Sequence, residues 1–396
     1  MILRRLSILT LTIVTISLNA QSKKMQMTKL ISDNFQFANQ QYKTLMQGLP
    51  NDKMPQTFNA TTGKVINMER TWWCTGFYPG SLWLIYEQTK DPIIKQEAER
   101  TLKVIEPNQT YTGNHDLGFM MFCSFGNAYR ITKKPEYKTI IFNSAEALYS
   151  RYRPTIPAIQ SWDKNTRFDC PVIIDNMMNL EMLNWVTLNG GDKKYEETSI
   201  KHSDTTMKNH FRTDFSSYHV IDYDINTGNV LKKKTWQGYS DDSAWSRGQS
   251  WGLYGYTMMY RFTKNKKYLD FAQNIAGFIL NHPNLPKDKI PYWDYNDPNI
   301  PNAPRDASAA ALMASAFLEL AQYTKGKDKT LYKENAEQIL VNLSSDAYRA
   351  KLGENGGFIL MHSTGALPLK SEIDVPLVYA DYYFLEALGR YKNWYL

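Results

Sequence analysis

Cysteine is scarce in this chain of 396 residues and occurs only as Cys74, Cys123 and Cys170. No Cys-x-x-Cys motif is present, and no two histidines stand at the spacing of a zinc site. Each cysteine lies in an apolar stretch that reads as helical, and cysteines of this kind are commonly buried. We therefore expect three buried free thiols, without a disulfide scaffold or a structural metal site.

Blocks of basic residues are also missing. The formal net charge is +7, but the lysines and arginines are dispersed along the chain. This distribution argues against a nucleic-acid partner and is compatible with a small acidic ligand. Hydrophobic residues make up 43% of the chain and aromatic residues 13%, which is enough for one large core.

A long apolar run occurs only at the N-terminus. Residues 1–22 read MILRRLSILTLTIVTISLNAQS, with a basic start, an apolar run and the small residue Ala20 near the end. This pattern is typical of a secretory signal peptide, and the run is short for a transmembrane helix. We predict a signal peptide over 1–20 and one domain over 21–396. The protein is expected to be exported to the periplasm, without membrane contact, as a monomer or weak homo-oligomer.

A similar joint recurs at intervals of a few tens of residues. Each joint places an apolar or aromatic helix end before a Thr-Lys or Gly turn, which Lys-rich residues follow. The joints cover 86–94, 129–137, 188–195, 260–268 and 321–332. Such recurrence is typical of repeat architectures, and the repeating unit here is a helical hairpin.

The helices on the two sides of these joints differ in composition. Those before a joint are rich in Gly, Ala, Met and aromatic residues, and they cover 71–88, 115–131, 172–188, 244–262, 306–323 and 376–391. Those after a joint, and a first one within 27–48, have one charged face. An apolar helix is buried and an amphipathic one borders water, so we predict six inner helices ringed by six outer ones, an all-α (α/α)6 barrel. Residues 219–234 alternate around a Gly turn and predict a small inserted β-hairpin.

Aspartates stand where the inner helices begin, and these N-terminal ends meet at one mouth of the predicted barrel. They are Asp116, Asp175, Asp242 and Asp306. Helix capping is the ordinary role of such an aspartate, and we expect it for Asp242 and Asp306. For Asp116, capping and chemistry are equally supported.

Asp175 is different because it lies within CPVIIDNMMNLEMLNW, a nearly continuous apolar run. Burial among apolar neighbours favours the protonated form of a carboxyl group, which suits a general acid near neutral pH. Several tryptophans gather at the same predicted mouth, as is typical of a carbohydrate cleft. Arg247 and Trp251 are four residues apart and therefore share one helix face.

Six stretches together resemble the unsaturated glucuronyl hydrolases, glycoside hydrolase family 88. They are RTWWCTGFYPGSLWL, NHDLGFM, VIIDNMMN, SYHVIDYDINTGNV, WQGYSDDSAWSRGQSWGLYG and PLVYADYYFLEAL, in the order that the family has them. The resemblance implies an (α/α)6 barrel that removes a 4,5-unsaturated uronic acid from the non-reducing end of lyase-generated glycosaminoglycan oligosaccharides of chondroitin, hyaluronan or heparin type. It implies hydration of the vinyl ether, with a proton added to C4 and water to C5, and neither metal nor cofactor.

The resemblance also implies roles for single residues. Asp175 matches the general acid and base, and Asp116 matches the second required aspartate, which holds the sugar hydroxyls. The substrate-binding positions of the family are matched by His219, Gln237, Arg247, Trp251 and either Trp72 or Trp73. One departure is Trp236, which stands where many members have histidine, so contacts to the leaving sugar are expected to differ there.

Three other interpretations remain open at this point. An unsaturated rhamnogalacturonyl hydrolase would share the fold and chemistry but act on pectin fragments. An ordinary barrel glycosidase would use two carboxyl groups for direct hydrolysis. A non-catalytic glycan-binding helical protein would need the tryptophans but not both Asp116 and Asp175.

Overall fold

The structure is a computed structural model that describes the backbone of residues 2–396 and the side chains of residues 21–396. The predicted signal peptide, residues 1–20, lies outside the described side chains. Helix α1 covers Ile2–Met46, and its later turns bury Met27, Ile31, Phe35, Ala38 and Tyr42 against the body. Among the residues searched, no helix is long and apolar enough to cross a membrane.

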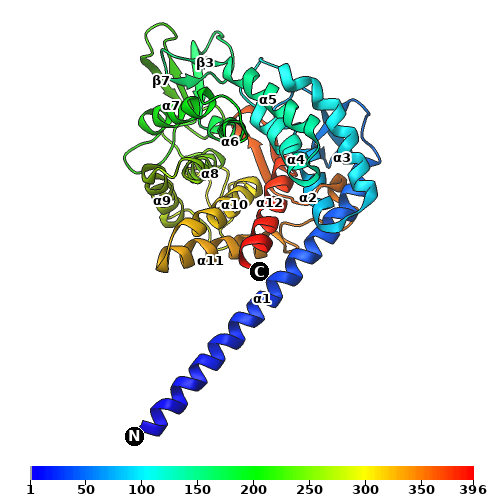
Figure 1. Ribbon diagram of the computed structural model, residues 1–396, viewed down its shortest axis with the longest axis vertical. Coiled ribbons are helices and arrows are strands. Elements are labelled where there is room, and N and C mark those ends of the chain that lie inside the picture. Colours follow the sequence, from blue (N-terminus) through cyan, green and yellow to red (C-terminus); the bar gives the residue numbers. More distant parts are fainter. Residues whose placement is uncertain (1) are drawn as a thin grey trace.

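Six helical hairpins form a ring, as Figure 1 shows, and the predicted (α/α)6 barrel is confirmed. The inner helices are α2 (Phe77–Thr89), the π-helix η2 (Gly118–Gly126) continued by α4 (Asn127–Thr132), the 3-10 helix η3 (Ile174–Met178) continued by α6 (Leu180–Leu188), α8 (Ser246–Thr263), α10 (Ala307–Tyr323) and α12 (Val378–Tyr395). The outer helices are α1, α3 (Pro92–Ile105), α5 (Pro135–Tyr149), α7 (Lys194–Asn209), α9 (Lys266–Asn281) and α11 (Gly326–Leu343). Short 3-10 helices are η1 (Glu106–Thr110), η4 (Asn355–Gly357) and η5 (Leu367–Leu369).

The inner helices are apolar because the ring encloses them on every side. In α10 every residue from Ala307 to Ala321 is buried, whereas α3 buries one stripe and exposes the rest. This is the contrast that the compositions predict.

The predicted hairpin is present as β6 (Val220–Tyr223) and β7 (Val230–Lys234), but it belongs to a three-stranded sheet of order β5-β6-β7. Strand β5 (Cys170–Ile173) pairs Val172 with Ile221. The prediction of an inner helix beginning at residue 172 was therefore wrong, because a short buried apolar run does not distinguish a strand from a helix.

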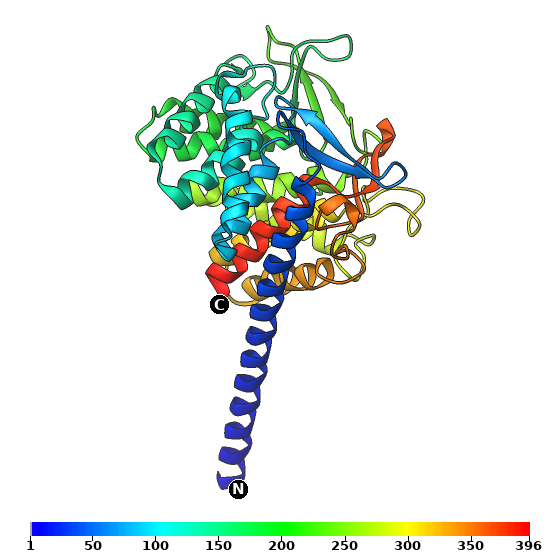
Figure 2. The ribbon, with the colours of Figure 1, turned by 90° about the vertical axis from the view of Figure 1, so that its right-hand side faces the viewer.

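Three further hairpins were not predicted. They are β1 (Lys53–Asn59) with β2 (Lys64–Glu69), β3 (Tyr152–Arg153) with β4 (Ala158–Ile159), and β8 (Ser363–Ala366) with β9 (Ser371–Val375). Figure 2 shows most of this β-structure on one end of the barrel, opposite the C-terminus. That end is the one to which the N-termini of the inner helices point.

The three cysteines are free, as predicted, and Cys74 and Cys170 are buried. Cys123 is only half-buried. Cys74 lies in the turn before α2 and Cys170 in β5, so the expectation of three helical positions was right only for Cys123, in η2.

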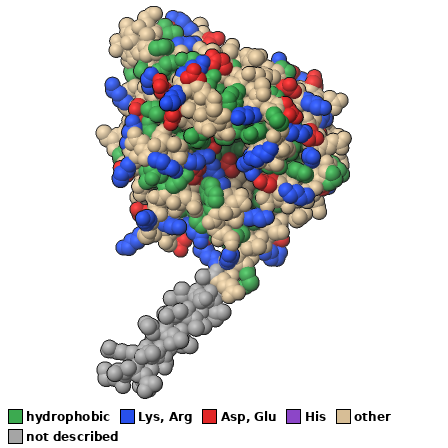
Figure 3. All heavy atoms as spheres, in the orientation of Figure 1, with side chains coloured by type: hydrophobic (Ala, Val, Ile, Leu, Met, Phe, Trp, Pro, Cys, Tyr) green, Lys and Arg blue, Asp and Glu red, His purple; other side chains and the backbone are tan. Residues whose placement is uncertain are grey.

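The opposite end of the barrel is hollowed, and Figure 3 shows acidic and basic side chains at the centre of this face. A cavity of about 510 Å³ opens there. Arg261 contacts Glu181 at 2.7 Å and Glu319 at 2.8 Å, and Arg390 contacts Glu319 at 3.0 Å. These ion pairs tie the C-terminal halves of several inner helices together.

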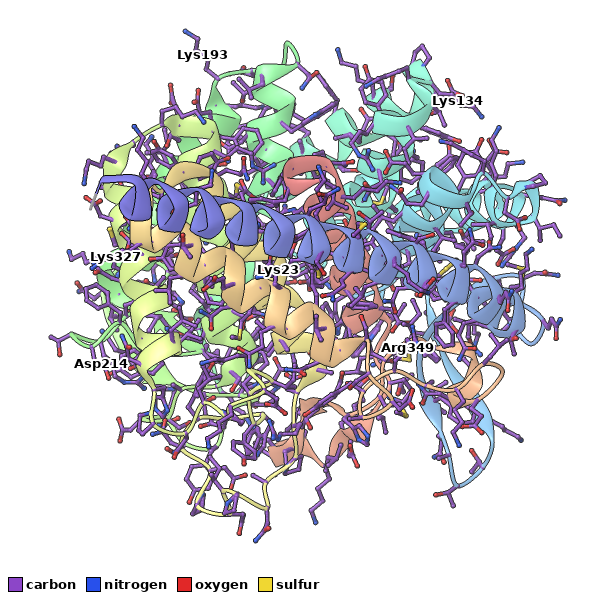
Figure 4. All side chains as sticks on the ribbon, turned by 90° about the horizontal axis from the view of Figure 1, so that it is seen from below. Lys23, Lys134, Lys193, Asp214, Lys327 and Arg349 are labelled. Atoms are coloured by element: carbon purple, nitrogen blue, oxygen red, sulfur yellow. The ribbon has the colours of Figure 1, made fainter. Side chains whose placement is uncertain are left out.

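Helix α1 is attached along α11 and the loop that follows it (Figure 4). Lys23 lies 2.5 Å from Glu337 of α11, and Arg349 donates to Asn34 at 2.9 Å. The guanidinium of Arg349 also stacks on Phe37, 4.8 Å from the ring centre. The first outer helix is thereby held to the last hairpin of the ring.

Candidate active site

The predicted catalytic aspartates come together where the inner helices η2 and η3 begin. Asp116 lies two residues before η2 and Asp175 is the second residue of η3. Close packing of these two segments depends on Gly118, since a Cβ there would lie 2.5 Å from Cα of Asn179. The side chain of Asn179 in turn accepts from the Phe119 N–H at 3.0 Å, which fixes the start of η2 against the end of η3.

Strand pairing brings His219 to Asp175. The Ile174 N–H donates to the His219 carbonyl at 3.1 Å, next to the paired residues Ile173 and Val220. Nε2 of His219 then lies 3.5 Å from Oδ2 of Asp175. Both groups are buried, and neither of these two atoms has a hydrogen bond within the described residues.

The tautomer of His219 follows from its other nitrogen. Nδ1 accepts from the backbone N–H groups of Trp236 at 3.1 Å and Gln237 at 3.2 Å. An atom that accepts two hydrogen bonds carries no hydrogen, so the ring hydrogen is on Nε2. Nε2–H therefore faces the Asp175 carboxyl group. The ring also packs on Trp245, with centres 4.6 Å apart.

Asp116 is held in a similar environment. Its Oδ1 lies 3.3 Å from Nε2 of His115, and its side chain is 14% exposed. Burial raises the pKa of Asp116 to about 8, and the negative charge of Asp175 acts in the same direction. Arg151 opposes this rise in pKa. Asp116 therefore holds a proton near neutral pH, close to the Asp175 carboxyl group.

Arg247 is placed differently from the expectation of an anion contact at the mouth. Its side chain is 1% exposed and lies 2.9 Å from Asp306. It also donates to the carbonyls of Thr364 and Gly365 of β8, each at 2.6 Å. The guanidinium stacks on Trp245 at 4.5 Å. Arg247 thus joins α8, α10 and the β8–β9 hairpin beneath the site, and its contact with substrate stays a prediction.

The two aspartates expected to cap helices behave differently. Asp306 is the N-cap of α10, where it accepts from the Ser308 N–H at 3.0 Å, so capping is confirmed. Asp242 does not cap, because α8 begins only at Ser246 with Trp245 as its N-cap.

The expected substrate-binding aromatic residues lie at different depths. Trp251 is 1% exposed and packs on Phe119 with ring centres 5.1 Å apart. Trp73 is half-buried against Tyr379, with ring centres 4.8 Å apart, whereas Trp72 is 41% exposed. Gln237 donates to the Gly365 carbonyl at 3.4 Å, which places its amide between β8 and His219.

Sequence reasoning missed one residue of the site, His115, and it named Trp245 only as one of the tryptophans near the predicted helix starts. His115 directly precedes Asp116 in the HD pair, and this neighbourhood was the available signal. Trp245 stacks between the His219 ring and the Arg247 guanidinium. The stacking with His219 joins segments that are distant in the sequence, so no local sequence pattern reveals it. Among the described side chains, no group of three metal-ligating residues is found, and independence from metals and cofactors stays a prediction.

Comparison with known proteins decides the family. No protein-family model matches the chain. An unsaturated glucuronyl hydrolase of Formosa agariphila is 49% identical over 325 residues, which span 81% of this chain and 80% of that protein. The chain belongs to the unsaturated glucuronyl hydrolases. It is accordingly a glycoside hydrolase.

Solved structures agree with this membership. The crystal structure of an unsaturated glucuronyl hydrolase specific for heparin superposes with a TM-score of 0.89 at 47% identity, covering 92% of this chain and 97% of that one. A variant of the Streptococcus agalactiae enzyme in complex with dGlcA-GalNAc6S superposes with a TM-score of 0.79 at 29% identity, covering 92% of each chain.

Proposed function

We propose that this unsaturated glucuronyl hydrolase removes the 4,5-unsaturated uronic acid from the non-reducing end of lyase-generated glycosaminoglycan oligosaccharides. The observation that carries the proposal is the buried pair Asp116 and Asp175, each facing the Nε2 atom of a histidine. Such a pair can hold one proton near neutral pH and deliver it to a carbon.

The proton is proposed to reach C4 of the uronate from Asp175. The raised pKa of Asp116, about 8, keeps a proton on this carboxyl group at pH 7. Sugar hydroxyls that donate to Asp116 favour its ionised form, and the proton that it gives up is proposed to pass to Asp175. Addition of this proton to C4 and of water to C5 gives a hemiketal, with the water's second proton returning to Asp175. The hemiketal opens between C5 and the ring oxygen, and the leaving sugar departs from C1.

The other residues are proposed to position the substrate. The His219 Nε2–H lies beside Asp175 and would orient its carboxyl group or the attacking water. Gln237, Arg247 and Trp251 are proposed to complete the pocket for the unsaturated uronate, Arg247 mainly by holding β8 in place. Trp73 is the favoured stacking residue, because it packs on Tyr379, whose ring the Arg247 guanidinium also contacts at 5.3 Å.

For the leaving sugar we propose a sulfated unit of the heparin type. The heparin-specific relative is 47% identical, and Trp236 carries a basic group: the Arg167 guanidinium lies 4.7 Å from its ring centre. Trp236 is adjacent to the site because its backbone N–H donates to His219. An arginine on an aromatic face can bind a sulfate while the ring contacts the sugar.

The test is a panel of unsaturated disaccharides from heparin, chondroitin, hyaluronan and pectin, followed by the loss of ene-acid absorbance. We expect turnover of glycosaminoglycan units, with heparin-type units highest. Turnover confined to rhamnogalacturonan fragments would replace the proposal with the pectin enzyme. A saturated glucuronide of the same linkage separates the mechanisms, since it lacks the double bond that Asp175 protonates. Its cleavage at a comparable rate would mean direct hydrolysis instead.

Solvent deuterium provides an independent test of the reaction. Turnover in D₂O should place deuterium at C4 of the uronate product at early times, as NMR would detect. Absence of label at C4 would contradict vinyl-ether hydration.

We also propose that the protein is exported through its N-terminal signal peptide, on the basis of residues 1–22. Mass spectrometry of the mature protein from the periplasmic fraction should find a new N-terminus near residue 21. An intact N-terminus in the cytosolic fraction would contradict export.

A further inference from the structure

The second site histidine, His115, is buried between Ser161 and Asp116. Its ring is 1% exposed. Nδ1 lies 3.3 Å from Oγ of Ser161, and Nε2 lies 3.3 Å from Oδ1 of Asp116. The three residues thus form a line from a loop serine through an imidazole to a carboxyl group.

The backbone holds Ser161 in place beside this ring. The His115 N–H donates to the Ser161 carbonyl at 3.0 Å, and the Ser161 N–H donates to the Pro171 carbonyl at 2.8 Å. The Ile173 N–H donates to Ser161 Oγ at 2.9 Å. Ser161 therefore connects strand β5, which leads to Asp175, with the segment that carries Asp116.

The hydrogen bonds available to Ser161 Oγ determine the tautomer of His115. One lone pair of Oγ is used by the Ile173 N–H, and Ser161 is fully buried. Were Nδ1 of His115 to carry the ring hydrogen, Oγ would accept twice and its own hydroxyl hydrogen would lack an acceptor. A buried donor without an acceptor is unfavourable. The hydroxyl therefore donates to Nδ1, and the ring hydrogen is on Nε2.

The ring is also neutral. Burial lowers the pKa of His115 to about 3, an effect larger than the opposing influences of the Asp175 charge and of a hydrogen bond with the Asn176 side chain. His115 is then neither an acid nor a base in the working range. What it offers to Asp116 is a directed Nε2–H.

We propose that His115 is a positioning residue of the reaction: Ser161 fixes it as the Nε2–H tautomer, and this N–H orients the Asp116 carboxylate toward the substrate hydroxyls. The two site histidines then work in the same way, each with an occupied Nδ1 and an Nε2–H on one aspartate. The kinetic part of this inference rests on the proposed function, whereas the tautomer does not.

The first experiment measures the tautomer without any substrate. Nitrogen-15 NMR of the imidazole side chains of the full chain distinguishes the two tautomers, and the chain has six histidines. The His115 signals are assigned by their loss in His115→Gln. We expect an unprotonated Nδ1 and a protonated Nε2 at His115, and a mixture in Ser161→Ala. A protonated Nδ1 in the wild-type protein would overturn the inference, whatever the substrate turns out to be.

The second experiment measures kcat and KM for an unsaturated disaccharide that the wild-type protein turns over. His115→Leu should lower kcat/KM by roughly 10- to 150-fold, as expected for a hydrogen bond to a charged group, mostly through kcat. His115→Gln should recover most of this loss, because its side-chain amide can donate near the position of Nε2. Equal activity of the leucine variant and the wild type, or equal loss in both variants with the fold intact, would overturn the positioning role.

A matched control separates positioning from packing. Ser144 on α5 is also fully buried and donates to a backbone carbonyl, that of Ile140 at 2.8 Å. Ser161→Ala should lower kcat several-fold, whereas Ser144→Ala should lower only the melting temperature. Similar kcat in both variants would contradict a specific role of Ser161. Should His115→Leu not fold, the NMR measurement and the two serine variants still decide.

Discussion

The two site aspartates differ in what surrounds them, although both face a histidine. Asp116 has a raised pKa of about 8. Asp175 has an Oδ2 atom that is buried and lacks a hydrogen bond within the described residues. A buried carboxyl oxygen without a hydrogen bond costs free energy.

Replacement of this carboxyl group should abolish proton transfer while the fold stays intact. Asp175→Asn is expected to lower kcat by at least about 10²-fold, the lower range for loss of general acid–base catalysis. Circular dichroism and kinetics on an unsaturated disaccharide measure the two effects. Asp242→Asn, an exposed position before α8, serves as the control. Activity of Asp175→Asn within a few-fold of the control would remove Asp175 from the mechanism.

Arg247 illustrates what sequence reasoning at this scale could not reach. Its helix and its neighbour Trp251 were predicted correctly from spacing. Its partners Asp306 and Thr364, however, are 59 and 117 residues away. No local sequence pattern reveals that Arg247 pairs with a buried carboxylate. The aspartates were easier, because an acidic residue in an apolar run is visible in the sequence itself.

Removal of the Arg247 charge should therefore affect stability as well as catalysis. Arg247→Met leaves Asp306 buried without its partner, which typically costs about 3–5 kcal/mol. Thermal unfolding should show a markedly lower Tm, and Arg247→Lys should recover part of it. An unchanged Tm together with a raised KM would instead identify Arg247 as a substrate contact alone.

The helical hairpins could be predicted from the sequence because the turns within them share one sequence pattern and one backbone conformation. Lys90, Lys133 and Lys264 all adopt left-handed backbone conformations, with φ of 58°, 59° and 54°. Each donates its N–H four residues back, to a tyrosine carbonyl. The Thr-Lys turn is thus a C-terminal stop for an inner helix. The hydrophobic periodicity of the helices can likewise be read from neighbouring residues in the sequence.

The β-elements were missed because they lack such local signals. Strand β5 is short and continuously apolar, so hydrophobic periodicity alone cannot identify it as a strand rather than a helix. Strand β9 has positive φ at Glu372 and Asp374, and it does not alternate as a regular strand would. Strand β5 exists through pairing with β6, which is distant in the sequence, and this pairing positions Asp175 beside His219.

The approach of η2 to η3 gives a prediction at this scale. Gly118→Ala places a Cβ 2.5 Å from Cα of Asn179, which must push the two segments apart and displace Asp116 from Asp175. We expect at least a tenfold loss of kcat/KM, since misplacement by about 1 Å can cost 10²-fold. Gly277→Ala in α9 meets no atom within 4 Å and should be neutral or stabilising by about 1 kcal/mol. Equal kinetics in both variants would show that this packing does not position the site.

Closure of the ring depends on contacts between the two ends of the chain. Asp381 of α12 accepts from Tyr42 of α1 at 3.2 Å and from the N–H groups of Ile359 and Leu360 at 2.9 Å each. Burial raises the pKa of Asp381 to about 7, although these three hydrogen bonds oppose the rise. The junction that closes the barrel and the catalytic pair therefore both contain a carboxyl group that holds a proton at unusually high pH.

The stability of the whole molecule should consequently fall as pH rises from 7 to 8.5. In the unfolded chain both carboxyl groups ionise near pH 4. In the folded chain Asp381 and Asp116 keep their protons to about pH 7 and 8. Through these two groups the folded state binds more protons between pH 4 and 8, and the stability that they contribute is lost as pH passes their folded pKa values. Buried His115, His202 and His210, whose pKa burial lowers to about 3, act in the opposite direction below about pH 6.5. The loss is therefore expected above pH 7.

Urea unfolding at several pH values should show this loss as about 1 kcal/mol between pH 7 and 8.5. Asp116→Asn should reduce it, because the catalytic pair then no longer adds a second ionising carboxyl group at high pH. At pH 8.5 this inactive variant should be more stable than the wild type, as expected where a functional site costs stability. Asp52→Asn, at an exposed position, should leave the pH dependence unchanged. A free energy of unfolding that is flat or rises over this range would mean that neither carboxyl group holds its proton in the folded protein.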